Sequence, residues 1–378
     1  MQQRIIGIDL ARAIAILLVT WKHSMASFGA RDHVQGWGFY GLEIVMQLAT
    51  PIFLILFGAM LELVYKNRYE RGDQIGTARR LHKRARQCYG YYCLAIIVFF
   101  LVMGTYSWMS LPLVFTGFIS VPYSHLLAFY TVALFLAPAL IMLRIRYGIV
   151  ALTGAAIMIQ LLHPMFAQLP PAPEIWGRDY LQHMSGFLYG KGVDFIGPSL
   201  IHGMSLVCFG MLFGYGLRAG SNSAGRLRVS PRISIAMVAA AFVVIAAFWS
   251  WTDPMVSIDA LVDASLRIDS HPMYFSVGLI GAIALTWICI LLFDVFKLQF
   301  GRALQVFGRR SLFAFGVGNI LAYIAPPTLP DTFGIWGSVL LLFGTVCTLT
   351  ILYDQIDRRR TSGTKHRLAP ITRVRAEM

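Results

Sequence analysis

Charged residues are scarce in this chain. Only 13% of its 378 residues are Asp, Glu, Lys or Arg, whereas 57% are hydrophobic. A soluble globular domain typically contains about 25% charged residues, which help to cover its surface. The low charge, together with a positive mean hydropathy, excludes an ordinary soluble protein. The composition predicts an all-α integral membrane protein that crosses the bilayer many times.

Cysteine is also rare, and its positions exclude several kinds of site. The five cysteines lie within or at the edges of apolar segments, with no spacing typical of a metal site or a disulfide framework. The sequence also lacks an HExxH motif, and it has no P-loop, GxSxG or dinucleotide-binding motif in a suitable context. We therefore expect no metal and interpret the cysteines as small buried side chains: Cys88, Cys93, Cys208, Cys289 and Cys347.

Long apolar runs are abundant, and ten of them reach the roughly 20 residues needed to cross a bilayer. If both termini are cytoplasmic, 26 of the 32 Lys and Arg residues lie on the cytoplasmic side and four lie outside. This is the distribution that the positive-inside rule expects. The net charge of +14 then reflects topology and contact with anionic membrane lipids, so no nucleic acid partner is expected. The predicted spans are 8–28, 39–65, 88–107, 124–143, 147–167, 195–217, 233–251, 271–296, 311–328 and 334–355.

The spans predict one transmembrane domain, residues 1–357, followed by a basic cytoplasmic tail, residues 358–378. The first apolar run differs from a cleaved signal peptide, because Asp9 and Arg12 interrupt its entrance and no small-residue cleavage site follows it. We interpret this run as a retained first span.

The first span carries ionisable side chains near both ends. Asp9 and Arg12 are three residues apart and can satisfy one another, while Lys22 and His23 lie near the far end. Eleven helical residues return to nearly the same face and advance about 16 Å, so Arg12 and His23 share a face. Ionisable groups within a bilayer are costly, and they usually face a cavity or each other.

Each of these residues allows two interpretations. The imidazole of His23 suits a general base, but it could also simply bond to a neighbouring helix. Asp9 and Arg12 could bind a ligand or anchor the helix at the inner interface. We expect Lys22 to extend towards the outer interface.

Arg12, ten intervening residues and His23 resemble the Arg-x10-His signature of the acyltransferase-3 superfamily of membrane proteins. The resemblance continues through PIFLILFGAMLE (51–62), which is similar to the second helix of that superfamily. Three further segments are most similar to the branch that succinylates osmoregulated periplasmic glucans, the OpgC type. They are RRLHKRARQCYGYY (79–92), HLLAFYTVALFLAPALIML (125–143) and FGRRSLFAFGVGNILAY (307–323). Asn319 departs from the pattern, because many members carry a histidine in its neighbourhood.

The resemblance implies a multi-pass protein of the bacterial inner membrane. Such a protein moves an acetyl or succinyl group from cytosolic acyl-CoA to a hydroxyl of an envelope glycan, with no tightly bound cofactor. His23 would be the general base, and Arg12, held by Asp9, would position the donor. A basic cluster before the third span would receive the CoA phosphates, although the positive-inside rule alone also explains its charge. The cluster consists of Arg79, Arg80, Lys83, Arg84 and Arg86.

Two other classes of function remain open. A secondary transporter would show inverted repeats and two broken spans at matching positions. The prolines instead lie near the span ends, at Pro51, Pro138, Pro164, Pro198 and Pro272. A catalytically inert assembly or scaffold protein would tolerate the loss of both Arg12 and His23.

Overall fold

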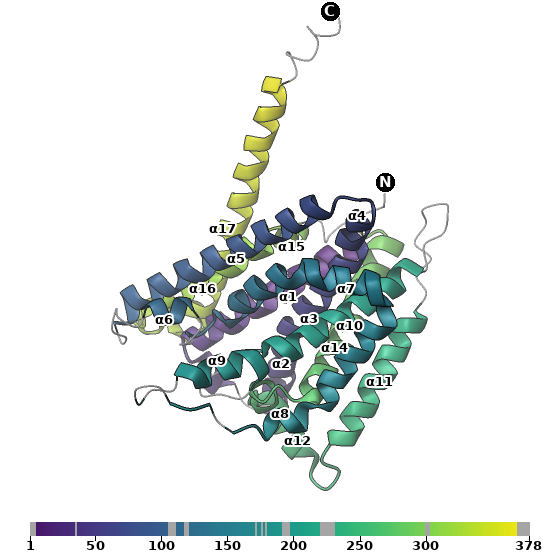
Figure 1. Cartoon of the computed structure of the whole chain (residues 1–378). Coiled ribbons are helices and arrows are strands. Elements are labelled where there is room, and N and C mark those ends of the chain that lie inside the picture. The colour runs from purple at the N-terminus through teal and green to yellow at the C-terminus, as the bar shows by residue number, and fades with distance from the viewer. Residues whose placement is uncertain are drawn as a thin grey trace, which may run out of the picture.

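The computed structural model describes residues 5–34, 36–104, 111–116, 121–170, 172–174, 177, 180–190, 197–219, 231–298 and 303–368. Across these ranges all regular elements are helices and no strand occurs, which confirms the predicted all-α fold. Figure 1 shows the helices gathered into a bundle, with the end of α17 projecting away from it. Residues 369–378 of the predicted tail, and parts of the predicted spans 88–107 and 195–217, lie outside the described residues.

The helices in the first half of the chain are α1 (Ile6–Ser27), η1 (Ala30–His33), α2 (Trp37–Gln47), α3 (Ala49–Met60), the π-helix η2 (Leu61–Lys66), α4 (Asn67–Glu70), α5 (Gln74–Met103), α6 (Leu111–Phe115), α7 (His125–Leu161), α8 (His163–Ala167) and α9 (Tyr180–Tyr189). Those in the second half are α10 (Leu200–Ala219), α11 (Arg232–Phe248), α12 (Pro254–Val262), α13 (Ser265–Ile268), α14 (Pro272–Ile290), the π-helix η4 (Leu291–Val295), α15 (Gln305–Arg309), α16 (Ser311–Ile324) and α17 (Leu329–Leu368).

Helix α1 lies in the middle of the bundle (Figure 1), where it packs against α2, α3, α14, α15, α16 and α17. Its alanines and long aliphatic residues favour a helix, and 12 of its 22 residues are buried. The backbone N–H groups of Ile6 and Gly7 donate to the Asp294 carboxylate at 2.9 and 2.7 Å. This carboxylate satisfies two of the donors that the start of a helix leaves unpaired. The helix that carries Arg12 and His23 is therefore held at its start and along its length.

Helices α3 and α10 approach closely because each has a glycine at the contact. A β-carbon at Gly58 would lie 1.9 Å from the carbonyl oxygen of Val207. One at Gly210 would lie 2.2 Å from the carbonyl oxygen of Ile55. Small residues allow membrane helices to gain dispersion contacts between their backbones. These two glycines therefore allow α10 to hold α3 in place, and α3 in turn packs against α1.

Six helical segments in the described part of the chain are long and apolar enough to cross a membrane. Helix α7 covers the predicted span 124–143 and most of 147–167, and it is divided at Gly148, where the backbone leaves helical geometry (φ 83°, ψ 174°). The predicted spans at α1, α11 and α16 correspond to helices outside the six; α1 carries three charged residues, and α11 and α16 are shorter. The number of spans and the side on which the termini lie stay predictions. The six segments are Trp37–Glu70, Gln74–Met103, His125–Leu161, Leu200–Arg218, Pro272–Val295 and Leu329–Arg360.

A buried ion-pair network lies along the π-helix η2. Glu62 is fully buried and accepts hydrogen bonds from Nε and Nη2 of Arg144, both at 3.0 Å. Lys66 Nζ lies 4.0 Å from Glu62 and 2.7 Å from Glu70. Other residues of the same turn, Leu63 to Tyr65, line a cavity that the next subsection describes. The network thus ties this part of the cavity wall to α7.

Candidate functional site

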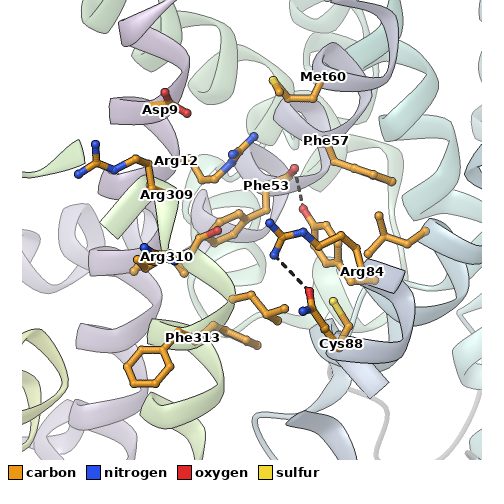
Figure 2. Close-up of a pocket in the computed structure, with 18 of the residues that line it drawn as sticks. Asp9, Arg12, Phe53, Phe57, Met60, Arg84, Cys88, Arg309, Arg310 and Phe313 are labelled. Carbon is orange, nitrogen blue, oxygen red and sulfur yellow. Dashed lines mark hydrogen bonds between the residues drawn. The ribbon is translucent and has the colours of Figure 1, made fainter. Parts of the chain in front are cut away.

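A cavity of about 1300 Å³ runs beside α1. Its lining along this helix extends from Ile5 to Ile16, a rise of about 16 Å. The other walls come from α3, η2, α4, α5, α7, α15, α16 and α17. In Figure 2, Asp9, Arg12, Arg309 and Arg310 lie on one side and Arg84 and Cys88 on the opposite side. The deep end, near Ile16 and Phe315, is apolar.

The lining has a strong excess of positive charge. Six arginines line the cavity, and Asp9 is the only acidic residue among the described residues that do so. Four of the arginines are exposed and mark the mouth of the cavity: two at the end of α4, one in the third turn of α5 and one at the end of α15. Arg12 is half-buried on α1. Guanidinium groups donate several hydrogen bonds in a planar fork that matches phosphate oxygens. The cavity is therefore suited to a phosphorylated ligand whose polar end stays at the mouth. The six are Arg12, Arg68, Arg71, Arg84, Arg309 and Arg310.

Two of these arginines are engaged by α17. Arg310 donates to Asp354 at 2.9 Å and to Asp357, and Arg309 lies 3.5 Å from Asp354. Tyr353 lines the cavity beside them, and its ring stacks on Phe313 with centroids 4.0 Å apart. The carboxylates leave less of the charge on Arg309 and Arg310 free for a ligand.

The other arginines are more available. No side-chain hydrogen bond or ion pair of Arg12, Arg68 or Arg71 is found within the described ranges. Among the described residues, Arg84 donates to Gln87 alone, at 3.3 Å. Asp9 and Arg12 both line the cavity, but no ion pair joins them among the residues described.

The members of the basic cluster expected on α5 lie on different faces of that helix, and only one of them lines the cavity. Arg84 lines the cavity, together with Gln87, Cys88 and Tyr91 on the same face. The other four members are exposed and do not line it; Arg80 instead lies 3.7 Å from Asp73. Successive residues on a helix turn by about 100°, so a dense basic run cannot face one ligand as a unit. The four residues outside the lining are Arg79, Arg80, Lys83 and Arg86.

His23 lies beyond the deep end of the cavity, seven residues or roughly 10 Å along α1 from Ile16. It is not part of the lining, but its ring centroid is 5.9 Å from that of Phe315, which is. The ring also packs against Tyr123 at 4.6 Å. One helix therefore carries an arginine inside the cavity and an imidazole beyond its apolar end.

The imidazole is held from α16. Its Nδ1 lies 3.0 Å from Oδ1 of Asn319, and Nδ2 of the same amide donates to the Tyr123 carbonyl at 2.9 Å. Asn319 is fully buried. The neighbouring Lys22 forms an ion pair, with its Nζ 3.2 Å from the buried carboxylate of Glu43. No group of His, Cys, Asp and Glu suited to a metal ion occurs in the described part of the chain.

Sequence reasoning missed several residues of this site. Arg68 and Arg71 were counted only as cytoplasmic charge, and Arg309 and Arg310 only as part of a motif. Their positions could have indicated a role. Arg68 and Arg71 follow an apolar span and Arg309 and Arg310 precede one, and both span ends lie on the same predicted side of the membrane as the start of α1. Asn319 stood out only as a departure from a pattern.

Comparison with known proteins gives a family match for the first part of the chain. Residues 4–120 match the family model described as OpgC protein. The matched region contains Asp9, Arg12, His23 and Arg84, but it spans less than half of the chain. No curated protein matches the sequence. The similarity to the OpgC family therefore holds for the helices α1 to α6, which include the helix at the centre of the site.

Proposed function

We propose that this chain is a multi-pass acyltransferase of the bacterial inner membrane. It would transfer an acetyl or succinyl group from cytosolic acyl-CoA to a hydroxyl of a cell-envelope glycan. The observation that carries the proposal is the arrangement along α1, where Arg12 lies in an arginine-lined cavity and His23 lies just past its apolar end. The similarity of residues 4–120 to the OpgC family favours this chemistry over transport.

The donor fits the charge and length of the cavity. CoA carries phosphates at one end and a thioester at the other, joined by a long flexible arm. Arg68, Arg71 and Arg84 at the mouth would bind the phosphates, in place of the full cluster expected on α5. Arg12, with Asp9 nearby, would position the arm farther in. The thioester would then approach His23 past Phe315.

The reaction needs a base beside the acceptor hydroxyl. The hydroxyl oxygen forms a bond to the thioester carbonyl carbon while its proton passes to His23. The C–S bond then breaks, and the CoA thiolate takes the proton back from the imidazole. The protein contributes mainly by holding the two substrates together next to the base.

The topology required is ten spans with both termini in the cytoplasm. The six long helices, together with α1, α11, α16 and the division of α7 at Gly148, supply helices for each predicted span. In this orientation the mouth of the cavity opens to the cytosol, where acyl-CoA is found.

Inverted membrane vesicles, with the cytoplasmic face outwards, provide the test. Acetyl-CoA or succinyl-CoA labelled in the acyl group is added, and label in luminal glycan is measured. The wild type and His33→Ala, which changes an exposed histidine, should transfer label, whereas His23→Ala should not. The two donors are ranked in the same assay.

Two outcomes contradict the proposal. If His23→Ala inserts normally and keeps full transfer, His23 is not the base. If the wild type transfers neither label despite intact protein, substrate-uptake assays should be run, because a transporter then becomes the better explanation.

A further inference from the structure

Asn319 is a fully buried amide that bridges the imidazole of His23 and a backbone carbonyl. Resting on the proposed function, we propose that Asn319 is a positioning residue. It holds His23 in the tautomer with the proton on Nδ1, so that Nε2 carries the lone pair that receives the substrate proton. Asn319 itself does not touch the reacting atoms.

The tautomer follows from the donors and acceptors around the amide. The Tyr123 carbonyl can only accept a hydrogen bond, so the group that faces it at 2.9 Å must be the NH₂ of Asn319. The carbonyl oxygen of the amide then faces Nδ1 of His23 at 3.0 Å, and this oxygen also can only accept. Nδ1 must therefore carry the proton. A neutral imidazole with a proton on Nδ1 has its lone pair on Nε2.

The carbonyl that orients the amide is itself fixed. Tyr323, one helical turn after Asn319 on the same face of α16, donates its hydroxyl proton to the Pro122 carbonyl. Two consecutive carbonyls of this turn are thus bound by α16. Tyr123 adopts φ 62°, a left-handed conformation that is unfavourable for a side chain of its size, and its ring packs on both His23 and Tyr323. Strained backbone of this kind tends to occur at functional sites, where many surrounding contacts hold it in place.

The consequence is that Nε2 is available without rearrangement. No hydrogen bond to Nε2 of His23 is found in the ranges that the structure covers. When Nε2 accepts the hydroxyl proton, Nδ1–H keeps its bond to Asn319, and the ring does not turn. The proton then passes from the same nitrogen to the CoA thiolate. Nε2 therefore both accepts the proton of the hydroxyl and returns it to the leaving group.

The test compares three variants in the vesicle assay, with initial rates measured over a range of acyl-CoA concentrations. Asn319→Leu removes both hydrogen bonds at similar volume and should lower kcat by about 10- to 100-fold, with KM for acyl-CoA changed by less than about twofold. Asn319→Asp keeps an oxygen for Nδ1–H and should retain part of the kcat that Asn319→Leu loses. Ser27→Ala is the control for packing between α1 and α16. The Ser27 hydroxyl bonds to the backbone carbonyls of His23, at 2.9 Å, and of Ala322 in α16, at 3.4 Å, but to neither nitrogen of the imidazole. This variant should keep the wild-type kcat.

A second measurement reports the tautomer without relying on activity. Solid-state NMR of protein labelled with ¹⁵N-histidine in lipid bilayers, with the His23 signals assigned by their loss in His23→Ala, should show Nδ1 protonated in the wild type. In Asn319→Leu the protonated nitrogen should change or become mixed.

The outcomes separate this inference from the proposed function. An inactive His23→Ala alongside a normal kcat in Asn319→Leu overturns the positioning role alone. So does an Nδ1 that is unprotonated in the wild type. A fully active His23→Ala overturns the proposed function, and the positioning role with it. Equal losses in Asn319→Leu and Ser27→Ala would mean that α1–α16 packing, not the tautomer, matters.

Discussion

Arg84 and Arg86 are a natural pair for testing which basic residues bind the donor. Both are exposed arginines on α5, but only Arg84 lines the cavity. A single exposed guanidinium–phosphate contact contributes modestly, so Arg84→Ala should raise KM for acyl-CoA by about three- to tenfold and leave kcat nearly unchanged. Arg86→Ala should change neither constant. If the two variants raise KM equally, CoA is attracted by the positive charge of the whole segment, and a position in the lining of the cavity gives Arg84 no special role in binding it.

The residues of the site differ in how far the sequence alone could identify them. The shared face of Arg12 and His23 follows from helix periodicity, which is a local property of one stretch. Asn319 lies 296 residues from His23, and no pattern within the chain indicates that the two side chains meet. The contribution of Arg68 and Arg309 likewise depends on tertiary packing. Sequence analysis thus identified the helix at the centre of the site but not the residues that other helices bring to it.

At the scale of elements, hydropathy predicted where most helices lie but not where they break. The interruption of α7 at Gly148 lies just inside the predicted span 147–167, and the π-helix η2 covers the end of the predicted span 39–65. Neither has a signal in the hydropathy of the sequence. Helix breaks depend on single backbone positions such as Gly148, whereas spans depend on averages over about 20 residues.

The contact between α3 and α10 gives a prediction about stability. Gly58→Ala places a methyl group 1.9 Å from the Val207 carbonyl oxygen, which forces the helices apart. Overpacking of this kind typically costs about 1–3 kcal/mol, so the melting temperature in detergent should fall. Gly154→Ala in α7 has no heavy atom within 4 Å of the new carbon and should leave the melting temperature unchanged or slightly higher. Equal melting temperatures for the two variants would argue against the close approach.

The buried pair of Glu62 and Arg144 gives a second prediction at this scale. Removing one partner leaves a buried charge, which typically costs about 3–5 kcal/mol. Glu62→Gln and Arg144→Met should therefore each lower the melting temperature clearly, and the double variant should recover part of the loss. Arg80→Ala is the control, because the 3.7 Å contact of Arg80 with Asp73 is exposed and weak. Additive losses in the double variant would mean that the two side chains are not coupled.

At the scale of the whole molecule, orientation in the membrane decides whether the cavity can receive a cytosolic donor. Asp354 and Asp357 of α17 bind Arg309 and Arg310 at the cavity mouth, so the end of α17 and the mouth lie on the same side. The excess of Lys and Arg predicts that this side is cytoplasmic. A measurement on α17 therefore also reports on the cavity.

Accessibility of introduced cysteines tests this orientation. In intact spheroplasts a membrane-impermeant maleimide should label Thr252→Cys, in the exposed connection between α11 and α12, but not Ser362→Cys in the last part of α17. Inverted vesicles should give the opposite result. The wild type controls for its five cysteines, which are buried or half-buried. Labelling of Ser362→Cys from outside would place the arginine-lined mouth in the periplasm. Since acyl-CoA is cytosolic, the cavity would then face the acceptor, and the assignment of Arg68, Arg71 and Arg84 to the CoA phosphates would be wrong even if His23 proved essential.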